Sequence, residues 1–248
     1  MARTTVPGRL DWQLTAVAGK RPETARAITL RLESADWPGH VPGQHVDIRL
    51  TAEDGYQAQR SYSIASAPEQ GWLELTVEDL ADGEVSPYLT EELRPGDQLE
   101  LRGPIGGYFT WTTADGGPLL LIAGGSGIVP LMSMLRYRAQ AGSDIPATLL
   151  YSSRTWEEII YRDELVRLEG EPATRVVHTL TRGHPPDWNG YTRRIDRAML
   201  AEVSGGASDG HAYICGPTAL VEGVAADLVA LGYAPDRVKT ERFGPTGG

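Results

Sequence analysis

The chain changes its pattern at residues 112–117, TTADGG, and this change is what most restricts its fold. Before it, short strand-like segments alternate with turn signals such as WPGHVPG, ADG and RPGD. After it, apolar strands alternate with helical segments. Because each pattern is typical of a different architecture, we expect two domains, at residues 1–114 and 115–248.

The first half is predicted to be β-structure, apart from one segment. Short strands at this spacing indicate a closed barrel or a sandwich. The exception is SPYLTEEL, residues 86–93, which has helical spacing and begins at Ser86, a residue type that caps helices. The expected strands are residues 12–17, 27–32, 45–50, 60–65, 73–78 and 98–102.

The second half is predicted to be a parallel sheet with helices on both faces, because its strands and helices alternate regularly. Its first strand, PLLLIA, is a continuous apolar run of the kind that is buried on both faces. The expected strands are residues 118–123, 147–153, 174–180, 211–215 and 238–243. The expected helices are residues 129–140, 157–168, 196–203 and 218–232.

Composition narrows the function. The 248 residues include 23 Lys and Arg against 33 Asp and Glu, a net charge of −10, which makes nucleic acid a poor partner. Cys215 is the only cysteine, so the chain holds no internal disulfide and no all-cysteine iron–sulfur cluster. The five histidines lack metal-ligand spacing, so we expect no metal. No apolar run has the length of a membrane span and no secretory signal is visible, so we expect a cytoplasmic protein.

Two glycine turns in the second half follow predicted strands. In LLLIAGGSGIVP, residues 119–130, the glycines let the backbone approach a ligand, and the helix-start amides with Ser126 would face a pyrophosphate. The spacing differs from G-x-G-x-x-G, so an ordinary tight turn stays an alternative. The second turn, Cys215-Gly216-Pro217, lies where parallel sheets bind ligands, although most lone cysteines are simply buried.

The first half also contains features suited to an anion. The strand QRSYSIAS, residues 59–66, presents a cation, hydroxyls and a flat ring, which suits a ligand that is anionic and flat. The segment DGEVSPYL, residues 82–89, places backbone amides at the start of the expected helix, a second anion site. A further glycine-rich loop, GPIGGYF at residues 103–109, is by itself an ordinary turn before a strand.

Six motifs now stand in order: R-S-Y-S, G-E-V-S, G-P-I-G-G-Y-F, G-G-S-G-I-V-P, C-G-P and a closing E-R-F. Their order and spacing resemble the ferredoxin–NADP(+) reductase superfamily over nearly the whole chain. Each motif alone is weak, but six in sequence are specific. The resemblance implies a two-domain fold, with an antiparallel β-barrel FAD-binding domain followed by an α/β parallel-sheet NAD(P)-binding domain.

The resemblance also implies roles for individual residues. Arg60 would pair with the FAD pyrophosphate, because guanidinium is a planar fork of donors. Tyr62 would stack on the isoalloxazine and Ser63 would bond near its N5 atom. Phe243 would cover the opposite face of the ring, and the five residues GPTGG that follow it could change how it moves. The implied FAD-binding residues are Arg60, Ser61, Tyr62, Ser63, Thr76, Val77, Gly83, Glu84, Val85, Ser86 and Phe243.

The implied catalytic residues are Ser63, Cys215, Glu241 and Phe243. They would align the nicotinamide C4 atom with flavin N5, orient the ring and balance charge, without covalent chemistry. The implied nucleotide-binding residues are Gly125, Ser126, Gly127, Ile128, Arg154, Arg162, Thr181, Arg182, Gly216 and Pro217.

The nucleotide is expected to be NADPH in preference to NADH. Sites for the 2′-phosphate carry arginine, whereas NAD sites commonly carry an acidic residue for the ribose diol. Arg154 follows one predicted strand, Thr181-Arg182 follows the next, and Arg162 could add a third charge. The alternative is that these are solvated surface arginines.

The sequence therefore predicts an FAD-dependent NAD(P)H oxidoreductase that passes electrons to a separate redox partner, such as a ferredoxin or another small redox protein. Arg193, Arg194 and Arg197 are one candidate docking patch, or else a solvated helix start. Two other readings stay open. One is a flavin or quinone reductase with a diffusible acceptor, which would gain nothing from a ferredoxin. The other is a non-catalytic nucleotide-binding electron-transfer subunit, whose FAD would stay oxidised when NADPH is added.

Overall fold

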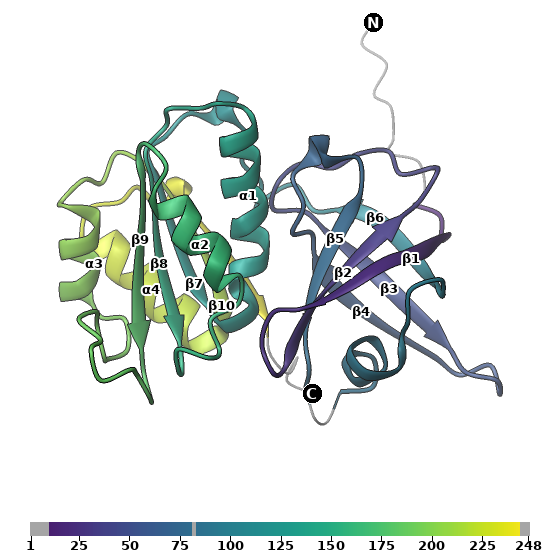
Figure 1. Cartoon of the computed structure of the whole chain (residues 1–248). Coiled ribbons are helices and arrows are strands. Elements are labelled where there is room, and N and C mark those ends of the chain that lie inside the picture. Colours follow the sequence, from purple (N-terminus) through teal and green to yellow (C-terminus); the bar gives the residue numbers. More distant parts are fainter. Residues whose placement is uncertain (1–9, 81–82, 244–248) are drawn as a thin grey trace, which may run out of the picture.

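The computed structural model describes residues 10–80 and 83–243. The first nine residues and the closing GPTGG lie outside the described residues. The expectations about a secretory signal and about the tail after Phe243 therefore stay predictions. Two sheets stand side by side (Figure 1). The first encloses one apolar core, and the second has an apolar core on each face. The boundary at 114/115 falls between the last strand of the first sheet and the first strand of the second, and its position stays a prediction.

The first sheet is antiparallel and has the strand order β4-β3-β6-β1-β2-β5. Its two ends meet, because Ile64 forms a bridge with Leu75 and the amide of Ala65 donates to the carbonyl of Glu74 at 2.8 Å. The predicted barrel is therefore confirmed. Its strands are β1 (Gln13–Pro22), β2 (Ala27–Glu33), β3 (His45–Thr51), β4 (Gln57–Ser63), β5 (Leu73–Glu78) and β6 (Gln98–Ile105).

The helical segment of the barrel lies where it was expected, but Ser86 does not cap it. Ser86 and Pro87 are α-helical, and a π-helical turn at Tyr88–Glu92 follows them. The Ser86 hydroxyl accepts from the Leu80 amide at 3.2 Å, so it ties down the preceding loop and does not cap the helix. An upstream amide has taken the acceptor that an N-cap serine offers to the first turn.

The second sheet is parallel, with the order β11-β10-β7-β8-β9, and helices cover both of its faces as predicted. β7 is buried along its whole length, and its alternate residues serve different cores. Leu119 and Leu121 pack with α1 and α2, whereas Leu120 and Ile122 pack with α3 and α4. The strands are β7 (Leu119–Gly124), β8 (Ala147–Ser153), β9 (Thr174–Leu180), β10 (His211–Pro217) and β11 (Val238–Phe243). The helices are α1 (Ile128–Gln140), α2 (Arg162–Glu169), α3 (Arg197–Ser204) and α4 (Thr218–Ala230).

One predicted helix begins later than expected. Helical spacing from residue 157 onward predicted a helix over 157–168, but α2 starts at Arg162. Tyr161 just before it has a φ of +59°, a left-handed conformation that a helix cannot contain. Ile159, Ile160 and Tyr161 are buried from an irregular segment, so their apolar spacing reflects packing of a loop.

Within the residues that the structure describes, no helix is both long and apolar enough to cross a bilayer.

Candidate functional site

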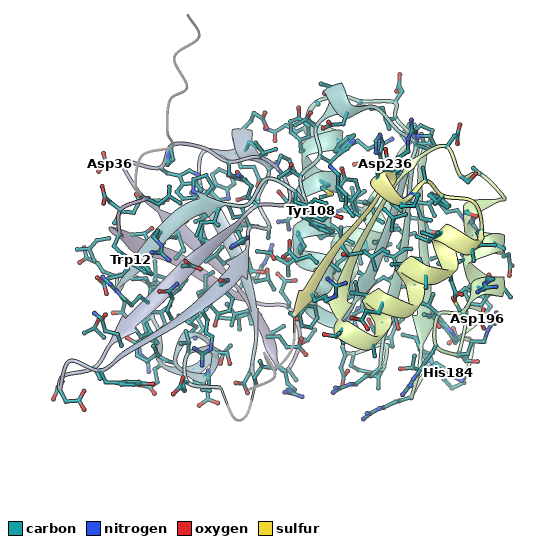
Figure 2. All side chains as sticks on the ribbon, turned by 180° about the vertical axis from the view of Figure 1, so that it is seen from behind. Trp12, Asp36, Tyr108, His184, Asp196 and Asp236 are labelled. Carbon is teal, nitrogen blue, oxygen red and sulfur yellow. The ribbon has the colours of Figure 1, made fainter. Side chains whose placement is uncertain are left out.

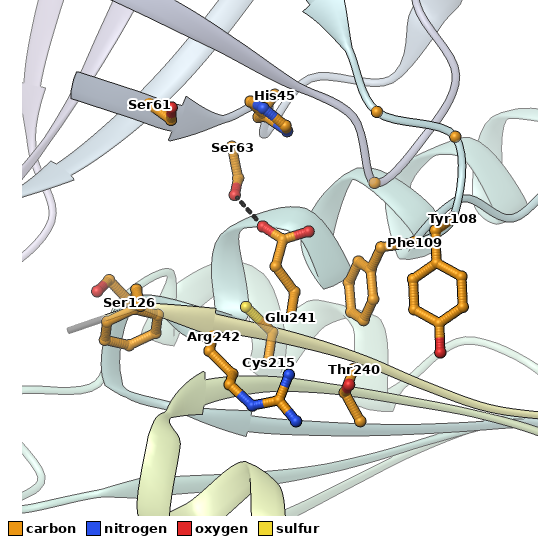
Figure 3. A pocket seen from close by; sticks show the side chains of 14 residues that line it. His45, Ser61, Ser63, Tyr108, Phe109, Ser126, Cys215, Thr240, Glu241 and Arg242 are labelled. Carbon is orange, nitrogen blue, oxygen red and sulfur yellow. Dashed lines mark hydrogen bonds between the residues drawn. The ribbon is translucent and has the colours of Figure 1, made fainter. Parts of the chain in front are cut away.

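A cavity of about 410 Å³ lies where the barrel meets the parallel sheet. Ser61 and Ser63 line it from β4 and Glu241 lines it from β11 (Figure 3). Phe243 of β11 also lines it. Cys215 contributes from β10 at the adjoining strand end. The cavity thus has walls from both domains, at the carboxyl edge of the sheet where parallel sheets bind ligands.

Three of the predicted catalytic residues contact one another or lie on neighbouring strands. Ser63 Oγ donates to Glu241 Oε1 at 3.3 Å, across the domain boundary. Cys215 and Glu241 are register partners of the parallel pair β10 and β11. Figure 3 shows the Glu241 carboxylate turned toward Ser63, with the Cys215 sulfur beside its base. The fourth residue, Phe243, is 37% exposed and lies two positions further along β11.

Burial is the largest influence on the pKa of both Glu241 and Cys215. Burial raises the pKa of Glu241, and the hydrogen bond from Ser63 opposes that shift. Burial and the neighbouring Glu241 carboxylate raise the pKa of the Cys215 thiol well above its ordinary value. Cys215 is only 2% exposed and is therefore a neutral thiol near neutral pH. A neutral buried thiol is a poor nucleophile, which agrees with a role in shaping the site.

The structure adds cavity residues that the sequence reasoning did not select. His45 on β3 is the register partner of Ser63, and burial lowers its pKa while the Asp47 carboxylate opposes this. Tyr108 is 62% exposed at the junction of the two domains, as Figure 2 shows from behind. The buried Phe109 packs edge-on against Tyr213. The GPIGGYF motif was the available signal for Tyr108 and Phe109; His45, one of five unpatterned histidines, had no such signal.

A second cavity of about 270 Å³ lies along the glycine turns of the parallel sheet. It gathers Gly125, Arg154, Thr181 and Pro217 from the predicted nucleotide set, and Phe243 lines both cavities. The barrel closes it with residues that sequence reasoning missed, namely Thr24, Arg26, Glu78 and Leu80.

Glycine is required where α1 starts. A Cβ on Gly127 would lie 2.1 Å from the carbonyl oxygen of Cys215, and one on Gly216 would lie 3.2 Å from the amide nitrogen of Gly124. Gly125 has a φ of +56°. The two glycine turns therefore pack directly on each other, which brings the α1 amides and the Cys215 turn to one edge.

The predicted flavin-phosphate residues are close together but outside both cavities. The exposed Arg60 forms an ion pair of 2.6 Å with Glu84, and Tyr56 donates to the same carboxylate at 2.9 Å. Glu84 belongs to the 83–86 segment, so the structure brings the predicted cation to the predicted loop of amides. Tyr62 is half-buried against the barrel core, and burial raises its pKa to about 12.

Other predicted residues do not line the cavities. Thr76 is buried with its hydroxyl shared between Thr29 and Tyr161, and Val77 lies in the barrel core. Arg162 lies over the Trp156 ring, 5.5 Å from its centroid. The remaining residues of this kind are Gly83, Val85, Ser86, Gly127, Ile128, Arg182 and Gly216. Their roles in cofactor binding stay predictions.

The candidate docking arginines are largely neutralised by neighbours. Arg193 pairs with Asp196 at 2.7 Å, and Arg197 pairs with Asp227 at 2.8 Å. Two of the three cations are thus compensated at the start of α3. Over residues 10–80 and 83–243, no group of three His, Cys, Asp or Glu side chains is placed to hold a metal ion.

The two cavities together suit two large ligands that carry rings and phosphates. Both are open at strand ends, glycine backbone forms part of each wall, and hydroxyls, arginines and an aromatic ring are available at fixed positions. These donors fit a flavin ring beside Ser63 and a dinucleotide along the glycine turns.

Comparison with known proteins decides the family. Residues 22–110 match the model "Oxidoreductase FAD-binding domain", and residues 121–226 match "Oxidoreductase NAD-binding domain". The chain is 35% identical over 234 residues to ferredoxin–NADP reductase B of Sorangium cellulosum, which covers 90% of this chain and 94% of that relative. The chain belongs to the ferredoxin–NADP(+) reductase superfamily. It contains the FAD-binding and NAD-binding domains of an oxidoreductase.

Two further similarities agree with this family. The chain is 30% identical over 208 residues to the glycine betaine monooxygenase reductase subunit of Pseudomonas aeruginosa, covering 83% of this chain. It spans only 56% of the length of that relative. The flavohem-like FAD/NAD binding domain of nitric oxide dioxygenase from Vibrio cholerae is 27% identical, with a TM-score of 0.84 over 94% of this chain and 98% of that one.

Proposed function

We propose that this reductase transfers a hydride from NADPH to bound FAD and delivers the electrons to a separate redox protein, such as a ferredoxin. The observation that carries the proposal is the meeting of Ser63, Cys215 and Glu241, from two domains, in one cavity. A site that only bound nucleotide would not need a hydroxyl, a carboxyl and a thiol from both domains at one point.

The cofactor supplies the redox chemistry, since bound FAD accepts two electrons as a hydride and can release them singly. The protein supplies binding and alignment. Arg60 and the amides of 83–86 would hold the flavin pyrophosphate, and Ser63 would face the reacting edge of the ring. Glu241 and the neutral Cys215 would orient the nicotinamide, while Phe243 would shield the ring from water.

The preference for NADPH is supported by the arginines at the ends of β8 and β9. Arg154 and Thr181 both line the second cavity, and the amide of Arg182 donates to the Arg154 carbonyl at 2.8 Å. The loops that carry the two arginines therefore adjoin, although of the two only Arg154 lines the cavity, and a 2′-phosphate bound at these loops would be near both. Glu158 also lines the cavity, so the arginines must outweigh one carboxylate there.

The acceptor is proposed to lie outside these 248 residues, because their one cysteine is too few ligands for an all-cysteine iron–sulfur cluster. The Pseudomonas relative is, by its name, the reductase subunit of a monooxygenase, so it too serves another component. Because Arg193 and Arg197 are ion-paired, the attraction of this surface for an acidic partner is weak. We expect the partner protein to contact this chain near Tyr108 instead, which is exposed and lines the first cavity.

The test is steady-state oxidation of NADPH by the FAD-loaded reductase with different acceptors. We expect a ferredoxin, followed through reduction of a cytochrome, to support turnover at least about tenfold faster than free FMN or a quinone at equal concentration. Equal or faster turnover with free FMN or quinone would identify a reductase with a diffusible acceptor. No oxidation of either NADPH or NADH would identify a non-catalytic subunit.

A further inference from the structure

Arg136 on α1 joins the two domains directly behind the site. Its side chain is only 8% exposed. Nε and Nη2 donate to the two carboxylate oxygens of Glu164 on α2, at 2.8 and 2.6 Å. Nη1 donates across the boundary, to the Ala65 carbonyl at 2.9 Å and to Glu74 of β5 at 3.0 Å. A guanidinium can make all four bonds because its donors form a rigid fork.

One of the two barrel groups that Arg136 contacts, the Ala65 carbonyl, lies two residues after Ser63. Residues 64–66 continue the chain from Ser63 and close the barrel, with the Ala65 amide bound to the Glu74 carbonyl and the Glu74 amide bound to Ser66 Oγ. Ser133, three residues before Arg136 and on the same helix face, donates to the Ser66 carbonyl at 2.7 Å. α1 therefore holds the chain two and three residues after Ser63, from positions about one helical turn apart.

The other end of α1 begins at the glycine turn of the parallel sheet. Gly127 precedes the helix and packs on the carbonyl of Cys215. One rigid helix thus connects the turn beside Cys215 to the strand end beside Ser63 (Figure 1). The distance between Ser63 and the Glu241–Cys215 pair depends on where this helix docks on the barrel.

The electrostatics fix Arg136 in place. Burial alone would raise the pKa of Glu164, but the hydrogen bonds and charge of Arg136 hold it below its ordinary value. Burial acts to lower the pKa of Arg136, and its partners more than reverse this. The guanidinium also lies over the Tyr161 ring, whose hydroxyl bonds to Thr76 of β5. Removing Arg136 would leave the Glu74 and Glu164 carboxylates without the buried cation that both of them contact.

We infer that Arg136 is an interdomain positioning residue, which fixes the strand end beside Ser63 against the nucleotide-binding domain. It touches neither cavity and acts through residues 64–66. Its kinetic consequence rests on the proposed hydride transfer: without the tether, the flavin edge beside Ser63 and the nicotinamide beside Glu241 lose their alignment, although each domain still binds its own ligand.

The chain provides a matched control in Arg138, two residues along the same helix. Arg138 is 3% exposed and donates three hydrogen bonds, but its partners are Ile145, Thr174 and Pro172, all in its own domain. A lysine at either position keeps the charge and loses the fork. The two substitutions therefore both disturb a buried guanidinium, and only Arg136→Lys breaks a connection between the domains.

The experiment compares Arg136→Lys, Glu74→Gln and Arg138→Lys with the parent protein. Glu74→Gln removes only the barrel carboxylate and keeps the Glu164 pair, so it covers the case in which Arg136→Lys does not fold. Hydrogen exchange in the apoprotein is followed at the Ala65 and Glu74 amides. Stopped-flow reduction of the FAD-loaded protein then gives the limiting rate, the NADPH dissociation constant and the flavin–nicotinamide charge-transfer absorbance.

We expect Arg136→Lys and Glu74→Gln to speed exchange at both amides about tenfold and to lower the limiting rate about tenfold. The NADPH dissociation constant should stay within about twofold and the charge-transfer absorbance should weaken. Arg138→Lys should leave all four readouts unchanged. Unchanged exchange in both interdomain variants, or equal changes in Arg138→Lys, would overturn the inference. If the parent protein is not reduced by either nucleotide, the proposed function fails, and the exchange comparison alone decides the tether.

Discussion

Ser63 and Glu241 lie 178 residues apart in the chain, and a hydrogen bond of 3.3 Å joins them across the domain boundary. Ser63 ends the barrel strand β4, and Glu241 lies on β11, the edge strand of the parallel sheet. The bond therefore reports the docking of one domain on the other. It also lies in the larger cavity, beside the buried Cys215.

The raised pKa of Glu241 predicts a pH-dependent gain in stability for Glu241→Gln. Because the pKa of Glu241 is higher in the folded state than its ordinary 4.5, the native apoprotein favours the protonated carboxyl. The wild-type contribution is thus present at low pH and lost as pH rises through the folded pKa. Glutamine does not ionise, so the variant should unfold at a higher temperature than wild type at about pH 8.

That gain should shrink as pH falls toward 4.5, and thermal unfolding of the apoprotein across this range measures it. The exposed Glu157→Gln is the control and should show no such trend. A gain for Glu241→Gln that is independent of pH would show that Glu241 is not held in a desolvated environment.

Arg60→Ala should weaken FAD binding with little effect on stability. The ion pair with Glu84 joins two side chains that are each 51% exposed, and exposed pairs contribute little to folding. A lost charge-assisted bond to phosphate should lower FAD affinity roughly tenfold or more. Isothermal titration of apoprotein with FAD measures this, with Arg31→Ala as the control, because Arg31 forms another exposed ion pair on the barrel, with Glu33. Equal losses in both variants would mean that Arg60 has no specific contact with the cofactor.

Arg182→Ala should raise the KM for NADPH roughly tenfold or more and leave that for NADH within about twofold, because only NADPH carries the 2′-phosphate. Steady-state kinetics with both nucleotides measure the ratio. Arg94→Ala, an exposed arginine of the barrel, is the control. Equal effects on both nucleotides would mean that Arg182 contacts a group that they share.

Gly127→Ala should destabilise the protein, because its Cβ would lie 2.1 Å from the Cys215 carbonyl oxygen. Gly127 has ordinary helical backbone angles, so the cost is steric and should be about 1–3 kcal/mol. Gly223→Ala in α4 has nothing within 4 Å of the new atom and should be stabilising by about 0.5–1 kcal/mol. Urea unfolding of both variants measures the contrast, and equal effects would contradict the tight contact between the glycine turns.

The sequence pattern predicted the architecture well because burial follows periodicity. Alternation in barrel strands such as β1 and β6 and the continuous apolar run of β7 both reflect which faces are covered. The α2 start was misplaced because Ile159 and Ile160 have helical spacing but pack from a loop, ahead of the left-handed Tyr161. Local spacing does not distinguish these two cases.

The site was harder to predict than the fold, because its contacts are long-range. The motifs selected Ser63, Cys215 and Glu241 individually, whereas their meeting depends on how α1 docks on the barrel. His45 reaches the cavity only through its register with Ser63, which the strand pattern does not specify. The barrel side of the second cavity, including Arg26 and Glu78, depends on domain packing in the same way.

The most direct test of the proposed hydride transfer is anaerobic reduction of the FAD-loaded protein in a stopped-flow cell. We expect rapid bleaching of the flavin absorbance on mixing with NADPH, and slower bleaching with NADH at the same low concentration. A protein that binds no FAD, or whose bound FAD neither nucleotide reduces, would contradict it.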